Sequence, residues 1–198
     1  MSTFNWDEYY EGADSRPLHP LYQSLREEHL PESGEGLRAI DLGCGTGRVA
    51  IDLLQRGYTV DAVDIYEPAL DQLRALAAVE PKLSVFAVPG EEFDFPSGAY
   101  DLAVFLFSIF FVDPEQFGGL WDRFVRSLAP GALICGQFLG PNDDWAAEGC
   151  TVHNREDLEQ MLAGFEPLHW EEADRDGKTV TGKEKHWHIH HVIARLKP

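Results

Sequence analysis

Two carboxylates and a run of alternate glycines form the clearest chemical pattern in the sequence. Asp41 ends a short apolar segment and is followed by three glycines at alternate positions: Gly43, Gly45 and Gly47. Asp64 ends a second apolar segment 23 residues after Asp41. Alternate glycines leave backbone N–H groups open to a ligand, and a carboxylate at the end of the next strand can accept both hydroxyls of a ribose. The pattern predicts a site for an adenosine-containing ligand.

The spacing of the glycines narrows the choice of ligand. Dinucleotide-binding loops carry G-x-G-x-x-G, whereas Arg48 stands here in the place of the third glycine. The lysine of a nucleotide-triphosphate loop is also missing, because the residues after Gly47 read Arg48-Val49-Ala50. Binding of a dinucleotide and binding of a nucleotide triphosphate are therefore both disfavoured. An NAD(P)-linked Rossmann oxidoreductase stays open only as an alternative.

An acidic residue followed by G-x-G-x-G at the end of a first strand resembles the first motif of class I S-adenosylmethionine-dependent methyltransferases. The resemblance implies S-adenosylmethionine as the cofactor and S-adenosylhomocysteine as its product. It implies that Asp41 faces the amino group of the cofactor, and that an acidic residue after the third strand faces the adenine. The cofactor-binding residues expected on this basis are Asp41, Gly43, Cys44, Gly45, Asp64, Ile65, Glu91, Glu92 and Phe107.

The C-terminal third resembles one branch of these enzymes more closely. G-x-x-D-x-W at positions 140–145, together with a terminal K-H-W-H and I-A-R, is similar to the tellurite-resistance-type methyltransferases. This branch implies a small acceptor, such as a thiol, an amine, a hydroxyl or a chalcogen oxyanion. We expect the acceptor site at Tyr9, Ser108, Asp143 and Trp145, with His188, His186 and Tyr10 as candidates for a catalytic base. A non-catalytic S-adenosylmethionine-binding protein is a second alternative.

Histidines at alternate positions invite a metal hypothesis. His186, His188 and His190 would point to one face of a strand, spaced about 7 Å apart. That spacing is too wide for all three to reach one zinc ion at about 2.1 Å. A pair of them assisted by Asp143 stays open, yet hydrogen-bonded side chains on a structural strand are favoured, and we predict no metal site.

The N-terminal segment carries its aromatic residues at helical spacing. Trp6, Tyr9 and Tyr10 would share one face of a helix. They can fill the core or form a lid that excludes water from the cofactor pocket. The sequence pattern leaves both interpretations open.

The elements that must position these residues alternate between strands and helices. Apolar runs predict strands at residues 37–42, 58–63, 83–88, 100–107, 132–138, 165–172 and 185–195. Thr46 is expected to cap the first core helix, and residues 174–178 to form a polar turn. The order predicts an α/β, Rossmann-like, doubly wound sheet, mainly parallel and seven-stranded. The resemblance adds an antiparallel last strand.

Composition limits the remaining possibilities. The 198 residues suit a single domain, 1–198, with an N-terminal helical or lid segment at 1–35 and the Rossmann-like core at 36–198. A formal net charge of −18 disfavours nucleic acid and anionic membrane partners. Three cysteines without a C-x-x-C pair indicate neither a disulfide framework nor a thiolate zinc site. We expect a cytoplasmic protein, monomeric or homodimeric, that acts on a small molecule.

Overall fold

The computed structural model describes residues 5–10 and 16–198. Its centre is a seven-stranded sheet in the order β3-β2-β1-β4-β5-β7-β6. The strands are β1 (Arg38–Leu42), β2 (Thr59–Asp64), β3 (Leu83–Ala87), β4 (Tyr100–Phe105), β5 (Leu128–Leu139), β6 (Phe165–Lys178) and β7 (Glu184–Leu196). Pairing is parallel from β3 to β5, and β7 runs antiparallel to both β5 and β6. The predicted fold class is confirmed.

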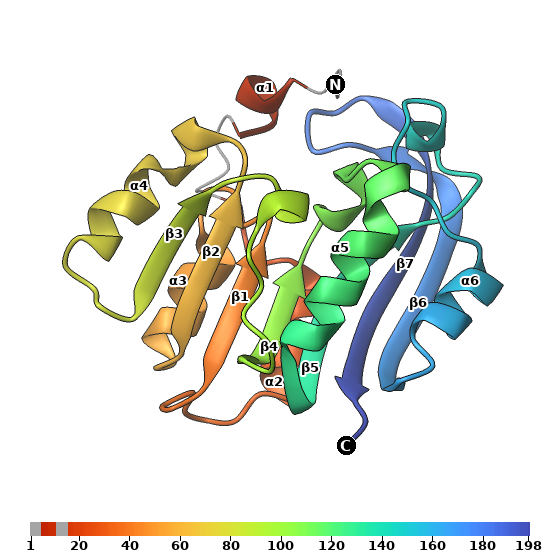
Figure 1. Ribbon diagram of the computed structural model, residues 1–198. Helices are drawn as coiled ribbons and strands as arrows, with labels where there is room; N and C mark the ends of the chain where they lie inside the picture. The colour runs from red at the N-terminus through yellow and green to blue at the C-terminus, as the bar shows by residue number, and fades with distance from the viewer. Residues whose placement is uncertain (1–4, 11–15) are drawn as a thin grey trace.

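Helices cover both faces of the sheet (Figure 1). On one face lie α2 (Pro20–Glu28), α3 (Arg48–Gln55) and α4 (Glu67–Ala77), which bury Leu25, Leu53 and Leu70 against the strands. On the other face, in front in Figure 1, α5 (Pro114–Ser127) and α6 (Arg155–Met161) bury Phe124 and Leu158. Among the described residues, no helix combines the length and apolar character needed to cross a membrane.

The first core helix does not begin as predicted. Gly47, not Thr46, is the residue before α3, and it adopts a left-handed conformation with φ of 83°. The Thr46 hydroxyl was expected to accept an N–H group at the start of this helix. Instead, the buried carboxylate of Asp41 accepts the Ala50 N–H at 3.1 Å. One of the open N–H groups of the first helical turn is thereby satisfied from the preceding strand.

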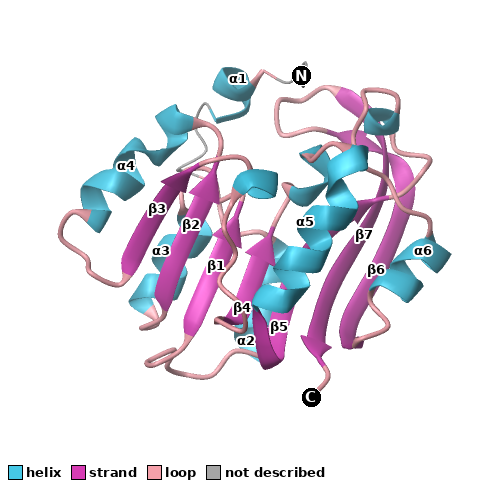
Figure 2. Ribbon diagram, in the orientation of Figure 1, coloured by secondary structure: helices cyan, strands magenta, loops and turns pink. Residues whose placement is uncertain are grey.

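The hairpin at the end of the chain is longer than predicted. Residues 174–178 continue β6 instead of turning, and the chain reverses at residues 179–183 (Figure 2). Asp174 pairs with His188 in the register, and Asp176 pairs with His186. The two aspartates lie 2.6 and 2.7 Å from the ring nitrogens of His186. These cross-strand pairs stabilise a segment whose composition alone favours a turn.

Candidate active site

The glycine loop lies at the carboxyl edge of the parallel strands, immediately after β1. Gly43 and Gly45 have φ values of 75° and 53°, a region that favours glycine. A β-carbon at Gly43 would approach the Ser108 side chain to 2.1 Å. The Gly43 N–H donates to the carbonyl of Val63 at 2.7 Å. The loop is therefore held tightly against the end of β2, where only glycine fits.

Asp64 ends β2 beside this loop. Its Oδ1 accepts the Tyr66 N–H at 2.8 Å, and its Oδ2 accepts the Gly45 N–H at 2.8 Å. Oδ2 also accepts a longer hydrogen bond, 3.4 Å, from the hydroxyl of Tyr10. Burial raises the pKa of Asp64 above its usual value, while these donors act in the opposite direction. Two N–H donors hold the carboxylate in place, and the weak third bond can be exchanged for a ligand hydroxyl.

A cleft of about 130 Å³, the loop cleft, opens between the glycine loop, the 3-10 turn η2 (Gly90–Glu92) and residues 107–112. Arg123 donates to the backbone carbonyl of Glu91, which fixes η2 against α5. The predicted site residues that line the loop cleft are Gly43, Asp64, Ile65, Glu91, Phe107 and Ser108.

Four predicted cofactor residues do not line the loop cleft: Asp41, Cys44, Gly45 and Glu92. Asp41 is buried behind the loop, and burial raises its pKa to about 7. Burial likewise raises the pKa of the Cys44 thiol. Gly45 lies under the ring of Tyr10, so that its own N–H reaches Asp64 but its outer side is covered. Glu92 is exposed on η2.

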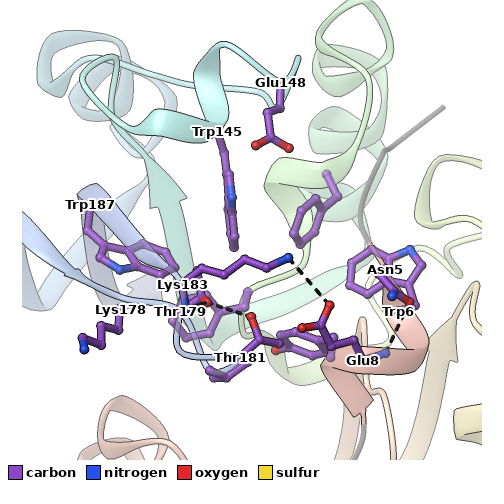
Figure 3. A pocket seen from close by; sticks show the side chains of 14 residues that line it. Asn5, Trp6, Glu8, Trp145, Glu148, Lys178, Thr179, Thr181, Lys183 and Trp187 are labelled. Atoms are coloured by element: carbon purple, nitrogen blue, oxygen red, sulfur yellow. Dashed lines mark hydrogen bonds and ion pairs between the residues drawn. The ribbon is translucent and has the colours of Figure 1, made fainter.

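A larger cavity of about 510 Å³, the aromatic cavity, lies next to the loop cleft (Figure 3). Its aromatic walls come from distant parts of the chain: Trp6, Tyr9, Phe107, Phe111, Trp145 and Trp187. Residues of the β6-β7 hairpin, including Thr179, Thr181 and Lys183, close one side. Trp6, Phe107 and Phe111 line both spaces, so the two cavities are adjacent.

A buried ion pair fixes two of the aromatic walls. The Lys185 ammonium lies 3.9 Å from the ring centroid of Trp187 and 4.5 Å from that of Trp145, and it pairs with Asp143. Asp143 accepts hydrogen bonds from the backbone N–H groups of Trp145 and His188, each at 3.0 Å. Burial lowers the pKa of Lys185, and the Asp143 carboxylate opposes that shift. Asp143 therefore positions Trp145 from behind and does not line the cavity.

The helix α1 (Trp6–Tyr10), which lies above the sheet in Figure 1, contributes Trp6 to the lining of both cavities and Glu8 and Tyr9 to the aromatic cavity. Tyr10 stacks on Tyr66 with ring centroids 5.2 Å apart, and the Tyr66 hydroxyl donates to Asp7. Glu8 pairs with Lys183 of the β6-β7 hairpin at 3.6 Å. These contacts connect α1 to the sheet edge on one side and to the hairpin on the other, and they support the lid interpretation.

The structure does not bring His186 or His188 to either cavity. The His188 ring packs on Gly140, accepts the Asn142 N–H at Nδ1 (3.2 Å) and lies 3.0 Å from Glu172 through Nε2. Successive side chains of a strand point to opposite faces, so it is Trp187, between the two histidines, that faces the aromatic cavity. Trp187 is absent from the sequence-based site, because the alternation along β7 separates it from the two histidines but does not tell which face meets the cavity.

Glu172, His188 and His190 form a cluster in which each residue offers one atom that could bind a metal ion. These three atoms lie within 4.8 Å of one another. Nδ1 of His190 accepts the Trp170 indole N–H at 3.3 Å, and burial lowers the pKa of His190 to about 4. Nδ1 of each of these histidines accepts an N–H hydrogen bond, and Nε2 of His188 lies 3.0 Å from Glu172. The geometry favours hydrogen bonding over metal coordination.

Comparison with known proteins places this arrangement in context. Residues 39–131 match the methyltransferase domain family. Magnesium-protoporphyrin O-methyltransferase of Rhodobacter capsulatus is 32% identical over 89 residues, which cover 45% of this chain and 40% of that protein. Carboxy-S-adenosyl-L-methionine synthase of Aeromonas salmonicida is 30% identical over 102 residues, 49% of this chain and 41% of that protein. The matched part thus covers about two fifths of each relative.

Solved structures share the fold over most of the chain. The 1,6-didemethyltoxoflavin-N1-methyltransferase of Burkholderia thailandensis, with bound 1,6-didemethyltoxoflavin and S-adenosylhomocysteine, superposes with a TM-score of 0.69 at 21% identity and covers 98% of this chain and 85% of its own. TehB of Haemophilus influenzae gives a TM-score of 0.75 at 16% identity and covers 96% of this chain and 66% of its own. At these identities the likeness shows the fold.

Proposed function

We propose that this chain transfers the methyl group of S-adenosylmethionine to a small molecule held in the aromatic cavity. Its domain match and its fold are those of class I S-adenosylmethionine-dependent methyltransferases. The observation that carries the proposal is the adjacency of the two cavities, which share Trp6, Phe107 and Phe111. A cofactor in the loop cleft and an acceptor in the aromatic cavity would meet at these three side chains.

The residues of the loop cleft fit the cofactor chemically. Asp64 offers a fixed carboxylate for the ribose hydroxyls, and a β-carbon at Gly43 would close the space beside Ser108. Glu91 and Ile65 line the same cleft, where the adenine would lie. The volume of the cleft is smaller than the range of about 300–1,000 Å³ that is usual for a ligand site, and Trp6 of α1 forms part of its wall. Cofactor binding therefore requires α1 to move away from Asp64.

Methyl transfer from a sulfonium is an in-line displacement, for which the bound cofactor supplies the electrophilic carbon. The protein has to align the acceptor and exclude water. Phe107 stands where the cavities meet, with φ of 50°, and Gln137 holds this conformation by accepting the Phe107 N–H at 2.9 Å. Burial raises the pKa of Tyr10, so the phenol stays protonated and is a poor base. Orientation by rigid aromatic walls is thus the main contribution of the protein.

The N-terminal segment acts in this proposal as a lid, and residues 36–198 as the core of a single domain. Arg48 supports the arrangement, because its guanidinium donates to the carbonyls of Arg16 and Pro17 at 3.0 and 2.5 Å. In a dinucleotide loop this position is a glycine that approaches a pyrophosphate. Here the side chain anchors residues 16–17 of the N-terminal segment, which disfavours the oxidoreductase alternative.

The proposal is tested by two measurements on the whole chain. Calorimetric titration with S-adenosylmethionine and with NADH should give binding of the first alone. Mass spectrometry should then detect methylated product when a panel of amines, phenols, thiols and chalcogen oxyanions is incubated with protein and cofactor. Binding of the cofactor without any methylated product would favour a non-catalytic S-adenosylmethionine-binding protein, and binding of NADH alone would favour the oxidoreductase.

A further inference from the structure

The lining of the aromatic cavity restricts the chemistry of its ligand. We infer that the acceptor is a planar aromatic or heteroaromatic molecule, neutral or positively charged, and not a small oxyanion. The inference rests on the proposed function, since it names the acceptor class of the same site. It is carried by the shape, the ring geometry and the charge pairing of the cavity.

The volume of the cavity is the first argument. At about 510 Å³ it lies within the range of about 300–1,000 Å³ that is usual for small organic ligands. A chalcogen oxyanion has only a handful of atoms and would leave most of that space to water. A bicyclic ring would fill far more of it and would displace water from the apolar walls.

The arrangement of the rings is the second argument. Trp145 and Trp187 meet edge to face with centroids 5.1 Å apart, and Trp6 and Phe111 do the same at 5.1 Å. Figure 3 shows the indoles of Trp145 and Trp187 projecting toward the same space, with Trp6 across from them. Offset and edge-to-face contacts are the geometries that aromatic pairs prefer. A flat ligand could extend this pattern from either pair.

Charge is the third argument. Two lysines line the cavity among the described residues, and each is paired: Lys183 with Glu8 at 3.6 Å, and Lys178 with Glu184 at 3.0 Å. The ammonium of Lys185, which lies behind the tryptophans, is paired with Asp143. The faces of aromatic rings carry negative potential, which attracts cations and repels anions. An anionic acceptor would therefore meet aromatic faces and lysines whose charge is already balanced.

The test uses protein saturated with S-adenosylhomocysteine, so that the cofactor side is complete. Four probes are titrated by calorimetry and by quenching of tryptophan fluorescence: quinoline, the neutral, saturated and non-planar bicycle decahydro-2-naphthol, quinoline-4-carboxylate and tellurite. Quinoline should bind, and decahydro-2-naphthol and quinoline-4-carboxylate should each bind at least about tenfold more weakly. Tellurite should not bind measurably.

Two variants locate the binding. Trp187→Leu removes a cavity wall and should weaken quinoline binding about tenfold, with S-adenosylhomocysteine binding unchanged. Trp170→Leu is the matched control, because Trp170 lies on β6 of the same hairpin and contacts His190 outside the cavity. Should Trp187→Leu not fold, Thr181→Trp serves instead, because it adds a ring inside the cavity and should abolish quinoline binding.

The inference would be overturned by tellurite binding more tightly than quinoline, or by equal losses of quinoline binding in Trp187→Leu and Trp170→Leu. Failure of S-adenosylhomocysteine to bind at all would instead contradict the proposed function. Turnover of tellurite by protein that binds the cofactor would keep the proposed function and refute the aromatic acceptor.

Discussion

The hydroxyl of Tyr10 lies 3.4 Å from Oδ2 of Asp64, the carboxylate oxygen that also accepts the Gly45 N–H. Helix α1 thus contacts the group that would bind the ribose of the cofactor on the proposed function. Tyr10 also covers Gly45, where an added β-carbon would lie 2.6 Å from its ring. On the proposed function, the Tyr10 hydroxyl and the ribose of the cofactor would compete for one carboxylate.

Replacing Asp64 should weaken the cofactor complex while the domain stays folded. Removal of a carboxylate that pairs with two hydroxyls leaves those hydroxyls without partners, so we expect Asp64→Ala to cost about 1–3 kcal/mol of S-adenosylmethionine binding. Calorimetric titration measures the loss. Asp71→Ala, at an exposed position of α4, is the control and should bind as the unmodified protein does. Equal affinity in Asp64→Ala would remove Asp64 from the site.

Removing the hydroxyl of Tyr10 should have the opposite effect. If the lid must release Asp64 before the cofactor binds, Tyr10→Phe removes one contact of the closed state and raises the apparent affinity by up to about tenfold. The association rate, followed by stopped-flow fluorescence, should rise with it. Tyr9→Phe, which changes the neighbouring residue of α1, serves as the comparison. Weaker binding in Tyr10→Phe would mean that the hydroxyl contacts the bound cofactor.

The ion pair behind the tryptophans should be important for stability. Lys185→Met leaves the Asp143 carboxylate buried without its cation, for which we expect a loss of about 3–5 kcal/mol in the free energy of unfolding. Urea denaturation measures the change. Adding Asp143→Asn should recover part of the loss, because the buried charge is then removed. Lys178→Met, on the exposed part of β6, should change stability by less than about 1 kcal/mol.

His190 should make the protein sensitive to acid. Its ring is fully buried, and burial lowers its pKa to about 4, against the opposing influence of Glu172 at 3.9 Å. As the pH falls below about 6.5, this histidine becomes protonated in the unfolded chain but stays neutral in the folded protein. Neutral His190 therefore contributes to the free energy of unfolding above pH 6.5, and this contribution is lost as the pH falls toward 4. The contribution of His190 should fall by about 1 kcal/mol between pH 7.5 and 5.5.

The measurement for His190 is the free energy of unfolding at both pH values. Between pH 7.5 and 5.5, the loss in the free energy of unfolding should be about 1 kcal/mol smaller in His190→Phe than in the unmodified protein. His169→Phe, at an exposed position of β6, should lose as much as the unmodified protein does. Identical pH profiles for His190→Phe and the unmodified protein would show that His190 is not the sensitive group.

Local pattern predicted which residues meet at the loop cleft, because these residues follow the ends of parallel strands. Gly43, Asp64 and Glu91 are brought to one edge by the alternation of strands and helices, whatever the packing behind them. The lining of the aromatic cavity depends on which face of β7 each side chain occupies. His186, Trp187 and His188 alternate without a clear apolar face, so only the covering layers decide that Trp187 points into the cavity. The hairpin length was mispredicted because charge pairing across strands is a tertiary property.

The tip of the β6-β7 hairpin, residues 179–183, lies outside the ladder of paired strands, yet Thr179, Thr181 and Lys183 line the aromatic cavity. None of these three lines the loop cleft. On the proposed function, substitutions at the tip would therefore change which molecules are accepted, while the residues that line the loop cleft stay the same. These five positions can therefore be varied in a library of variants, which can be screened for new acceptors while the rest of the sequence is kept.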